Sequence, residues 1–175
     1  MKLRYSPTSP YVRKVLVCAI ERNLEEGIER LATNTADPKS DLSSVNPLGK
    51  VPALILDGPA RCTGMRRQAL ADGILDAAIL RMIESGRRPQ ELRWPASIEL
   101  QSGKMKRAVE TLNKEAASFG NTVNLGTIAV GCALGYLDFR FAADDWRSGA
   151  PALASWYEGF AQRPAMQRTR PPEGA

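Results

Sequence analysis

The sequence predicts a small α/β domain followed by an all-helical domain. In residues 1–60, short apolar runs lie between Pro, Gly and Asn, which is typical of strands joined by turns. From residue 65 onward, apolar residues recur at helical spacing in long stretches. The 175 residues are enough for two small domains with buried cores. We therefore place the domains at residues 1–60 and 65–175.

The chain opens with a predicted strand, a turn and a helix. Residues 2–5 alternate as a strand does, and residues 12–20 carry apolar side chains at helical spacing. Ser9 is a natural N-cap for this helix, and Pro10 falls at the first helical position, where its missing N–H costs nothing. A second strand is predicted at residues 28–31, followed by a polar stretch with a short helix before residue 46.

The stretch from Asn46 to Leu56 combines a turn with a strand. Asn46-Pro47 opens the turn, and Gly49 can supply a positive φ. Residues 51–56 form an apolar run typical of a short buried strand. An X-Pro bond before a strand is a usual place for a cis peptide, and we expect one at Val51-Pro52. The backbone of Val51 would then be free to pair with an extended peptide.

Together these motifs resemble the N-terminal half of glutathione transferases, which has a thioredoxin-like fold. Ser9-Pro10-Tyr11-Val12 lies where related redox proteins carry Cys-Pro-Tyr-Cys. Gly126-Thr127-Ile128-Ala129 and Arg163-Pro164-Ala165-Met166 resemble the all-helical bundle that forms the second domain of the family. The resemblance covers almost the whole chain.

The resemblance implies a transferase of the detoxification type that conjugates the glutathione thiolate to small electrophilic or hydrophobic substrates. Glutathione would be its co-substrate, and a homodimer its expected assembly. A hydroxyl at a helix N-terminus can stabilise the thiolate, and Ser9 is placed for that catalytic role. Ser9 would otherwise simply cap its helix. Thr8 or Ser6 would replace it if the turn is rotated.

The other substrate-binding candidates lie at the Val-Pro turn. By the same resemblance, Val51 and Pro52 would hold the backbone of the tripeptide, with Thr8 near its sulfur. Lys50, next to the turn, could approach a carboxylate of glutathione, although an exposed lysine is usually only solvated.

One part of the family pattern is missing. Glutathione transferases place a fourth strand and a third helix after the strand that ends here at Leu56. Residues 57–64 are a breaker-rich link, which is too short for such a unit. The acidic-Ser pair that grips the γ-glutamyl group belongs to the missing unit, so no residue is assigned to it. Either the chain lacks the unit or the sequence omits it. In the first case the last strand would be an unpaired sheet edge, and Leu54 and Leu56, or Ile55 on the opposite face, would be exposed.

Two other functions remain open. A folded but catalytically impaired binding or scaffold protein is the main alternative, because the site would be incomplete. A thioredoxin-class redox protein is disfavoured, because Ser9 and Val12 replace both exchange-competent cysteines.

Composition narrows the chemistry further. The chain has no histidine, which excludes Ser-His-Asp hydrolysis and histidine general bases. Its three cysteines show no metal spacing, so neither a metal site nor a disulfide framework is predicted, and Cys18 and Cys132 are expected in the core. The net charge of +5 is spread over short pairs such as Arg66-Arg67, which we expect on solvated faces, without a nucleic-acid-binding stripe. No membrane span or signal peptide is recognised, which favours the cytoplasm.

The helical domain has its own expected pattern. A helix from residue 65 carries the stripe Met65, Ala69, Leu70, Leu75, Ile79, Met82 and Ile83, and a second runs from Pro95 to Ser118. Residues 127–139 are apolar nearly all round, which predicts a central helix capped by Thr127 with only half a capping box. A last helix begins at Pro151. The aromatic residues Phe141, Trp146, Trp156, Tyr157 and Phe160 are expected to cluster around it.

Overall fold

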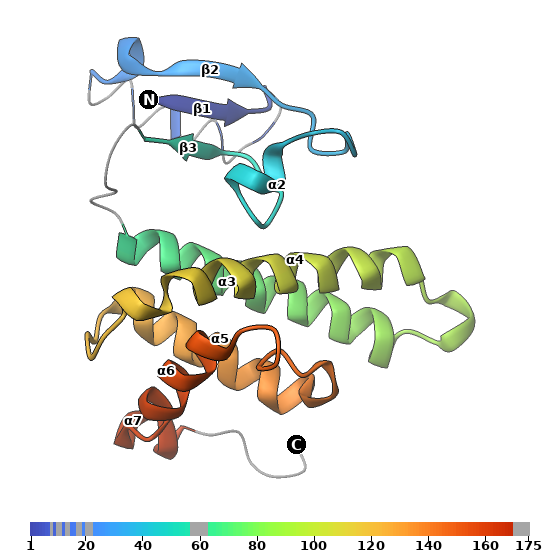
Figure 1. Ribbon diagram of the computed structural model, residues 1–175. Coiled ribbons are helices and arrows are strands. Elements are labelled where there is room, and N and C mark those ends of the chain that lie inside the picture. Colours follow the sequence, from blue (N-terminus) through green and yellow to red (C-terminus); the bar gives the residue numbers. More distant parts are fainter. Residues whose placement is uncertain are drawn as a thin grey trace. The chain divides into compact units, whose positions relative to one another are not determined.

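The computed structural model describes residues 1–7, 9, 12, 15–16, 19, 23–56 and 63–169. The chain divides into two compact units, Met1–Arg61 and Cys62–Ala175. Figure 1 shows strands in the first unit and helices in the second, and this confirms the predicted fold class. Each unit is described by itself.

The N-terminal unit is built on a mixed three-stranded sheet. Its strands are β1 (Lys2–Tyr5), β2 (Glu29–Ala32) and β3 (Ala53–Ile55), in the order β2-β1-β3. β1 pairs with β2 in parallel and with β3 in antiparallel orientation. A 3₁₀ turn (Glu25–Gly27) precedes β2, and the short helix α2 (Leu42–Val45) precedes β3.

Apolar residues from several segments form the core of this unit. Leu3 in the central strand is fully buried. Four other apolar residues have at most 7% of their surface exposed: Val12, Ala19, Leu42 and Leu48. Val12 and Ala19 belong to the first predicted helix, and both are helical. Burial of these side chains supplies the main driving force for this small unit.

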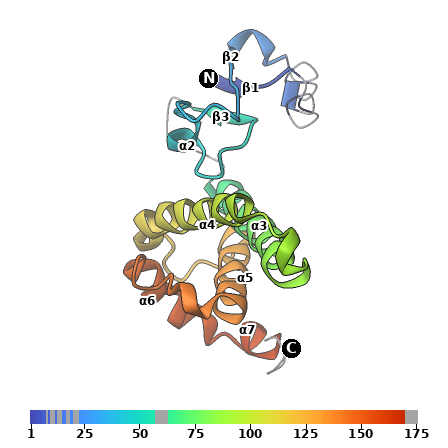
Figure 2. The same cartoon turned by 90° about the vertical axis from the view of Figure 1, so that its right-hand side faces the viewer.

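In its described residues the second unit contains helices joined by turns and no strand. Its main helices are α3 (Thr63–Met82), α4 (Pro95–Glu115), α5 (Leu125–Arg140), α6 (Pro151–Ala161) and α7 (Pro164–Arg168). A π-helical turn (Ile83–Arg87) extends α3, and 3₁₀ turns lie at Gln90–Leu92, Ala116–Ser118 and Ala142–Asp144. Figure 2 shows α3 beside both α4 and α5.

The buried face of α3 differs from the predicted stripe. Met65, Ile79 and Ile83 are exposed, whereas Leu70, Ala71, Ile74, Ala77 and Ala78 are buried. The reason is that α3 packs against two helices, so its buried face is broad and contains small residues that allow close approach. The closest approach is at Gly126 of α5, where an added Cβ would lie 2.5 Å from the carbonyl oxygen of Gly64. In α4 and the turn after it, the spacing of apolar residues predicts the buried face Ile98, Met105, Ala108, Val109, Leu112, Ala116 and Phe119. All of these are buried except Ile98, which is half-buried.

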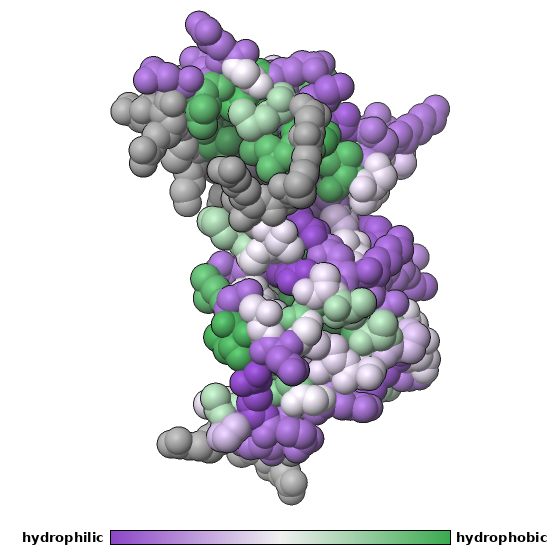
Figure 3. All heavy atoms as spheres, turned by 60° about the vertical axis from the view of Figure 1, so that its left-hand side comes forward, coloured by the Kyte–Doolittle hydropathy of each residue, from purple (hydrophilic) through white to green (hydrophobic). Residues whose placement is uncertain are grey.

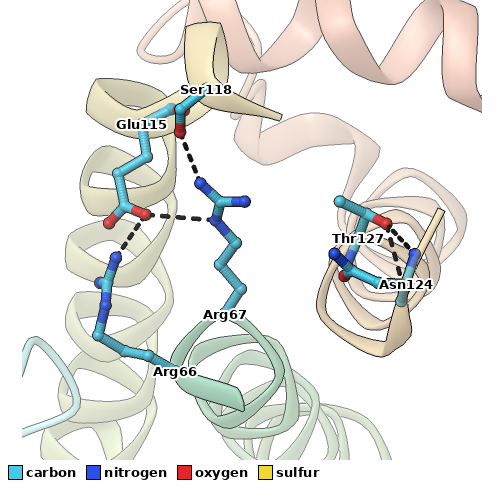
Figure 4. Close-up of polar contacts among 6 residues, drawn as sticks. All are labelled: Arg66, Arg67, Glu115, Ser118, Asn124 and Thr127. Carbon is cyan, nitrogen blue, oxygen red and sulfur yellow. Dashed lines mark hydrogen bonds and ion pairs between the residues drawn. The ribbon is translucent and has the colours of Figure 1, made fainter. Parts of the chain in front are cut away.

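The N-terminus of α5 also corrects a prediction. Asn124, not Thr127, is the N-cap: its Oδ1 accepts the N–H of Thr127 at 3.0 Å. The hydroxyl oxygen of Thr127 accepts the N–H of Asn124 at 3.0 Å in return. A complete capping box therefore forms, with the fully buried Thr127 at its third position (Figure 4).

Arg67 is buried, contrary to the expected solvated position. Its Nε lies 3.4 Å from Oε2 of Glu115, and a terminal nitrogen donates to Oγ of Ser118 at 2.5 Å (Figure 4). The guanidinium also lies over the ring of Phe119, 4.2 Å from its centroid. Glu115 at the C-terminal end of α4 and Ser118 in the turn that follows thus compensate the cost of burying this charge.

Two further expectations are corrected. Cys132 is exposed, since it lies on the face of α5 that turns away from the core; Cys18 and Cys62 lie outside the described residues. The aromatic residues form two groups rather than one. Trp156 contacts Phe119 and Phe160, with centroid distances of 4.9 and 4.7 Å, whereas Trp146 contacts Tyr157.

Candidate functional site

The strand register brings the two predicted site segments to one end of the sheet. β1 ends at Tyr5, and the chain continues toward Ser9. β3 is antiparallel to β1 and begins at Ala53, which pairs with Arg4 near the end of β1. Residues that follow β1 and residues that precede β3 therefore leave the sheet at the same end.

The Asn46–Pro52 turn is held by the Asn46 side chain. Its Oδ1 accepts the N–H of Leu48 at 3.1 Å, and its Nδ2 donates to the carbonyl oxygen of Lys50 at 2.8 Å. Gly49 has a φ of 61°, which confirms the predicted positive φ. These bonds fix the path of the backbone from Asn46 to the residue before Val51.

The Val51-Pro52 peptide bond is cis, as predicted. Val51 and Pro52 are both half-buried, and the residues of β3 that pair with β1 begin only at Ala53. The backbone of Val51 therefore lies beyond the paired part of the strand. Lys50, which precedes this bond, is exposed.

Ser9 is half-buried and caps the first helix. Its Oγ accepts the N–H of Val12 at 3.3 Å, and its own N–H donates to the carbonyl oxygen of Ser6 at 3.1 Å. A hydroxyl has one hydrogen to donate in addition to its acceptor positions, so capping leaves the Ser9 hydrogen available to another acceptor. Thr8, Pro10 and Tyr11 lie outside the described residues.

Among the residues that the structure describes, β3 is an edge strand, and it carries exposed apolar side chains. It is the last strand in the sheet order, and α3 begins at Thr63. Leu54 pairs with the buried Leu3 and shares its face, and Leu56, two residues on, points the same way. Yet Leu54 is 45% exposed and Leu56 is 38% exposed. Figure 3 shows hydrophobic residues gathered on one face of this unit. The predicted exposure of both leucines is confirmed.

A metal site and a membrane span each place requirements on the described residues. Within them, no three acidic, cysteine or histidine residues are grouped so that they could hold a metal ion. The helices described there are also too short or too polar to cross a membrane.

One organising contact was not recognised from the sequence. The side chain of Asn46 bonds both sides of the turn, whereas the sequence suggested only that Asn-Pro opens it. The signal was present, because Asn side chains commonly bond the backbone two residues on. The acceptor at Lys50 depends on the folded path of the turn and has no such local signal.

Two family models match the chain. The model described as the N-terminal domain of glutathione S-transferase matches residues 8–73, and the one described as the C-terminal domain of glutathione S-transferase matches residues 95–159.

Individual relatives match over nearly the whole chain. An uncharacterized GST-like protein, YibF of Escherichia coli K12, is 32% identical, and the alignment covers 99% of this chain and 100% of that protein. A glutathione transferase family member from Pseudomonas fluorescens Pf-5, solved with bound glutathione, is 36% identical with a TM-score of 0.63; the match covers 98% of each chain. A glutathione S-transferase from Methylobacillus flagellatus KT, solved with glutathione bound, is 32% identical with a TM-score of 0.60 and covers 98% of this chain and 99% of that one.

The alignment with the Escherichia coli relative also measures a difference in length. It spans 205 positions, whereas this chain has 175 residues, so at least 30 positions of the relative have no counterpart here. A strand of about five residues and a helix of about eleven, with their loops, fit within that length. The length difference is therefore large enough for the fourth strand and third helix that are not recognised in the sequence after Leu56.

Proposed function

Because this chain belongs to the glutathione transferase family, we propose that it binds glutathione in its N-terminal unit and transfers the thiolate to small electrophilic substrates. Residues 1–60 would form the glutathione-binding domain, without its last strand and helix, and residues 65–175 the helical domain. Glutathione is the co-substrate in this proposal. The bound glutathione in the two solved relatives supports it.

The observation that carries the proposal is the meeting of two segments at one end of the sheet. Ser9, with a hydroxyl hydrogen to donate, and Val51, with a backbone beyond the strand pairs, leave the sheet at the same end. A tripeptide thiol needs both kinds of contact: a donor to its sulfur and backbone partners for its peptide groups.

The proposed chemistry begins with the thiol of glutathione. An unperturbed thiol has a pKa of about 8.5, so only a minor fraction is thiolate at neutral pH. The Ser9 hydroxyl donates to the sulfur, and the start of the helix favours its negative charge; both effects lower the thiol pKa. The thiol proton passes to water. The thiolate then attacks the electrophilic carbon, a C–S bond forms, and the leaving group departs with its electron pair.

The rest of the tripeptide would be held by the turn. We assign the backbone of Val51, next to Pro52, to the peptide groups of glutathione, and Lys50 to one of its carboxylates. Thr8 is proposed near the sulfur, where it or Ser6 would replace Ser9 if that residue serves only as a cap.

The test compares two serine variants in a conjugation assay with a chloronitrobenzene substrate. Ser9→Ala should lower turnover at least about tenfold while costing only about 1 kcal/mol of stability from the lost cap. Ser43→Ala is the matched control, because Ser43 is an exposed serine of α2 that is not part of the proposed site. Unchanged turnover in Ser9→Ala would remove Ser9 from the chemistry.

A second candidate is a glutathione-binding or scaffold protein without turnover. The edge position of β3 among the described residues and the shorter length of this chain favour it, because a chain without the family's fourth strand and third helix would lack the contacts to the γ-glutamyl group. Retention on immobilised glutathione combined with no conjugation would support this candidate. Retention with turnover supports the transferase.

We also propose a cytoplasmic homodimer. Several large apolar side chains are exposed on the helical unit, and a second copy would bury them: Ile79, Leu80, Leu92, Trp94 and Leu100. The cytosol holds the glutathione pool that such an enzyme would use. Sedimentation as a monomer at high concentration would contradict the dimer.

A further inference from the structure

We propose that the helical unit holds a second ligand site, for a small organic cation with an apolar body. The site is a cavity of about 460 Å³ between the C-terminal ends of α3 and α5, the middle of α4, and residues 141–149. Small-molecule sites commonly have volumes of about 300–1,000 Å³. All its lining residues belong to the helical unit, so the site is distinct from the proposed glutathione site.

The floor of the cavity is apolar and rigid. Met105 and Val109 of α4 and Leu137 of α5 line it, and each is at least nine-tenths buried in the helical core. Trp146 forms part of the wall, and its Nε1 donates to Asp138 at 2.8 Å, which fixes the position of the ring. A preformed apolar surface of this kind suits the hydrocarbon or aromatic body of a ligand.

The charges around the cavity are negative in sum. Arg81 and Lys106 contribute two positive charges, and Glu110, Asp144 and Asp145 three negative ones, a net charge of −1 in a chain whose total is +5. Arg81 bonds Asp144 through both terminal nitrogens, so these two cancel. The remaining groups are two carboxylates and one lysine, which favours a positively charged ligand.

Both remaining carboxylates have capacity for a ligand. Glu110 is exposed and makes no ion pair with any other described residue. Asp145 accepts the hydroxyl of Ser148, and a carboxylate can accept several further hydrogen bonds. Lys106 lies one helical turn before Glu110, and its long stem lets its ammonium group turn toward water.

The aromatic walls suit the apolar body of the ligand. The guanidinium of Arg81 already lies 4.6 Å from the centroid of the Phe141 ring, and that of Arg147 lies 4.7 Å from Trp146. Because these two arginines already make the cation–π contacts of both rings, we assign the charge of the ligand to Glu110 and Asp145 instead. The apolar floor, the aromatic walls and the two carboxylates therefore select the same class of ligand.

Fluorescence titration with the cationic dye thioflavin T tests the site. We expect saturable binding that weakens as salt is raised, and weaker binding of the anionic dye 1-anilinonaphthalene-8-sulfonate. The double variant Glu110→Gln, Asp145→Asn should weaken thioflavin T binding about tenfold, because it removes both carboxylates. Glu99→Gln is the matched control, since Glu99 is an exposed carboxylate of α4 outside the cavity. Unchanged dye affinity in the double variant would overturn the proposal.

Two more variants locate the dye. Val109→Phe fills the floor and should abolish dye binding while leaving retention on immobilised glutathione unchanged, provided that its circular dichroism is native. Leu54→Lys, in the other unit, should leave dye binding unchanged. Dye binding that is lost in Leu54→Lys would assign the dye to the exposed sheet edge and refute the cavity site, whatever the glutathione assays show.

Discussion

Replacing Glu115 by Ala should destabilise the helical unit more than replacing its partner Arg67 by Met. Figure 4 shows why: the Glu115 carboxylate lies between two arginines, at 2.5 Å from Arg66 and 3.4 Å from Arg67. Arg67 is the buried member, with 8% of its side chain exposed. Removal of the carboxylate leaves a buried positive charge without a counter-charge.

The magnitudes follow from these contacts. An uncompensated buried charge costs about 3–5 kcal/mol, and we expect about 3 kcal/mol for Glu115→Ala because the carboxylate is itself 21% exposed. Arg67→Met removes the charge, replaces its stem with apolar volume, and leaves Glu115 paired with Arg66. Its loss of the hydrogen bond to Ser118 and of the contact with Phe119 should cost about 1 kcal/mol.

Urea unfolding followed by circular dichroism measures both values. Arg66→Ala serves as the control, because Arg66 is 45% exposed and exposed ion pairs contribute about 0–1 kcal/mol. If Arg67→Met loses as much stability as Glu115→Ala or more, then Glu115 does not act mainly by compensating the buried charge of Arg67. That result would refute the reasoning.

Four other substitutions have defined outcomes. Gly126→Ala should lower stability by about 2 kcal/mol, since the new Cβ meets the Gly64 carbonyl at 2.5 Å; an unchanged melting temperature would contradict this close approach. Asn124→Ala should cost about 1 kcal/mol in urea unfolding through loss of the α5 cap, and a neutral result would mean that the capping box does not contribute. Asn46→Ala should weaken retention on immobilised glutathione by loosening the turn before Val51, whereas equal retention would separate the turn from binding. Leu54→Lys should reduce association beyond the dimer in sedimentation and change stability by less than about 0.5 kcal/mol; larger species that persist in the variant would exclude the β3 edge as their cause.

Local sequence signals predicted the site turn and the sheet edge well. Gly49 and Pro52 act through their own backbone restrictions, so the positive φ and the cis bond were both predicted correctly. The exposed Leu54 and Leu56 followed from counting the residues between two predicted elements. These inferences needed no knowledge of distant partners.

The errors concern residues whose environment is set by distant segments. Arg67 is buried because Glu115, 48 residues away, lies beside it, and no pattern near Arg67 shows that. The exposure of Met65 depends on α3 packing against two helices at once. Asn124 takes the cap in place of Thr127 because the helix begins earlier than its apolar run.

Calorimetric titration with glutathione is the most direct test of the proposed function, with the intact chain and Ser9→Ala compared. We expect both proteins to bind glutathione. If the chain lacks the unit that supplies the γ-glutamyl contacts, the affinity should be about tenfold or more below that of a complete site. Proton release on binding should be large for the intact chain and small for Ser9→Ala, since only the former stabilises the thiolate. Absence of any binding heat in the intact chain, together with no conjugation, would contradict the proposed function.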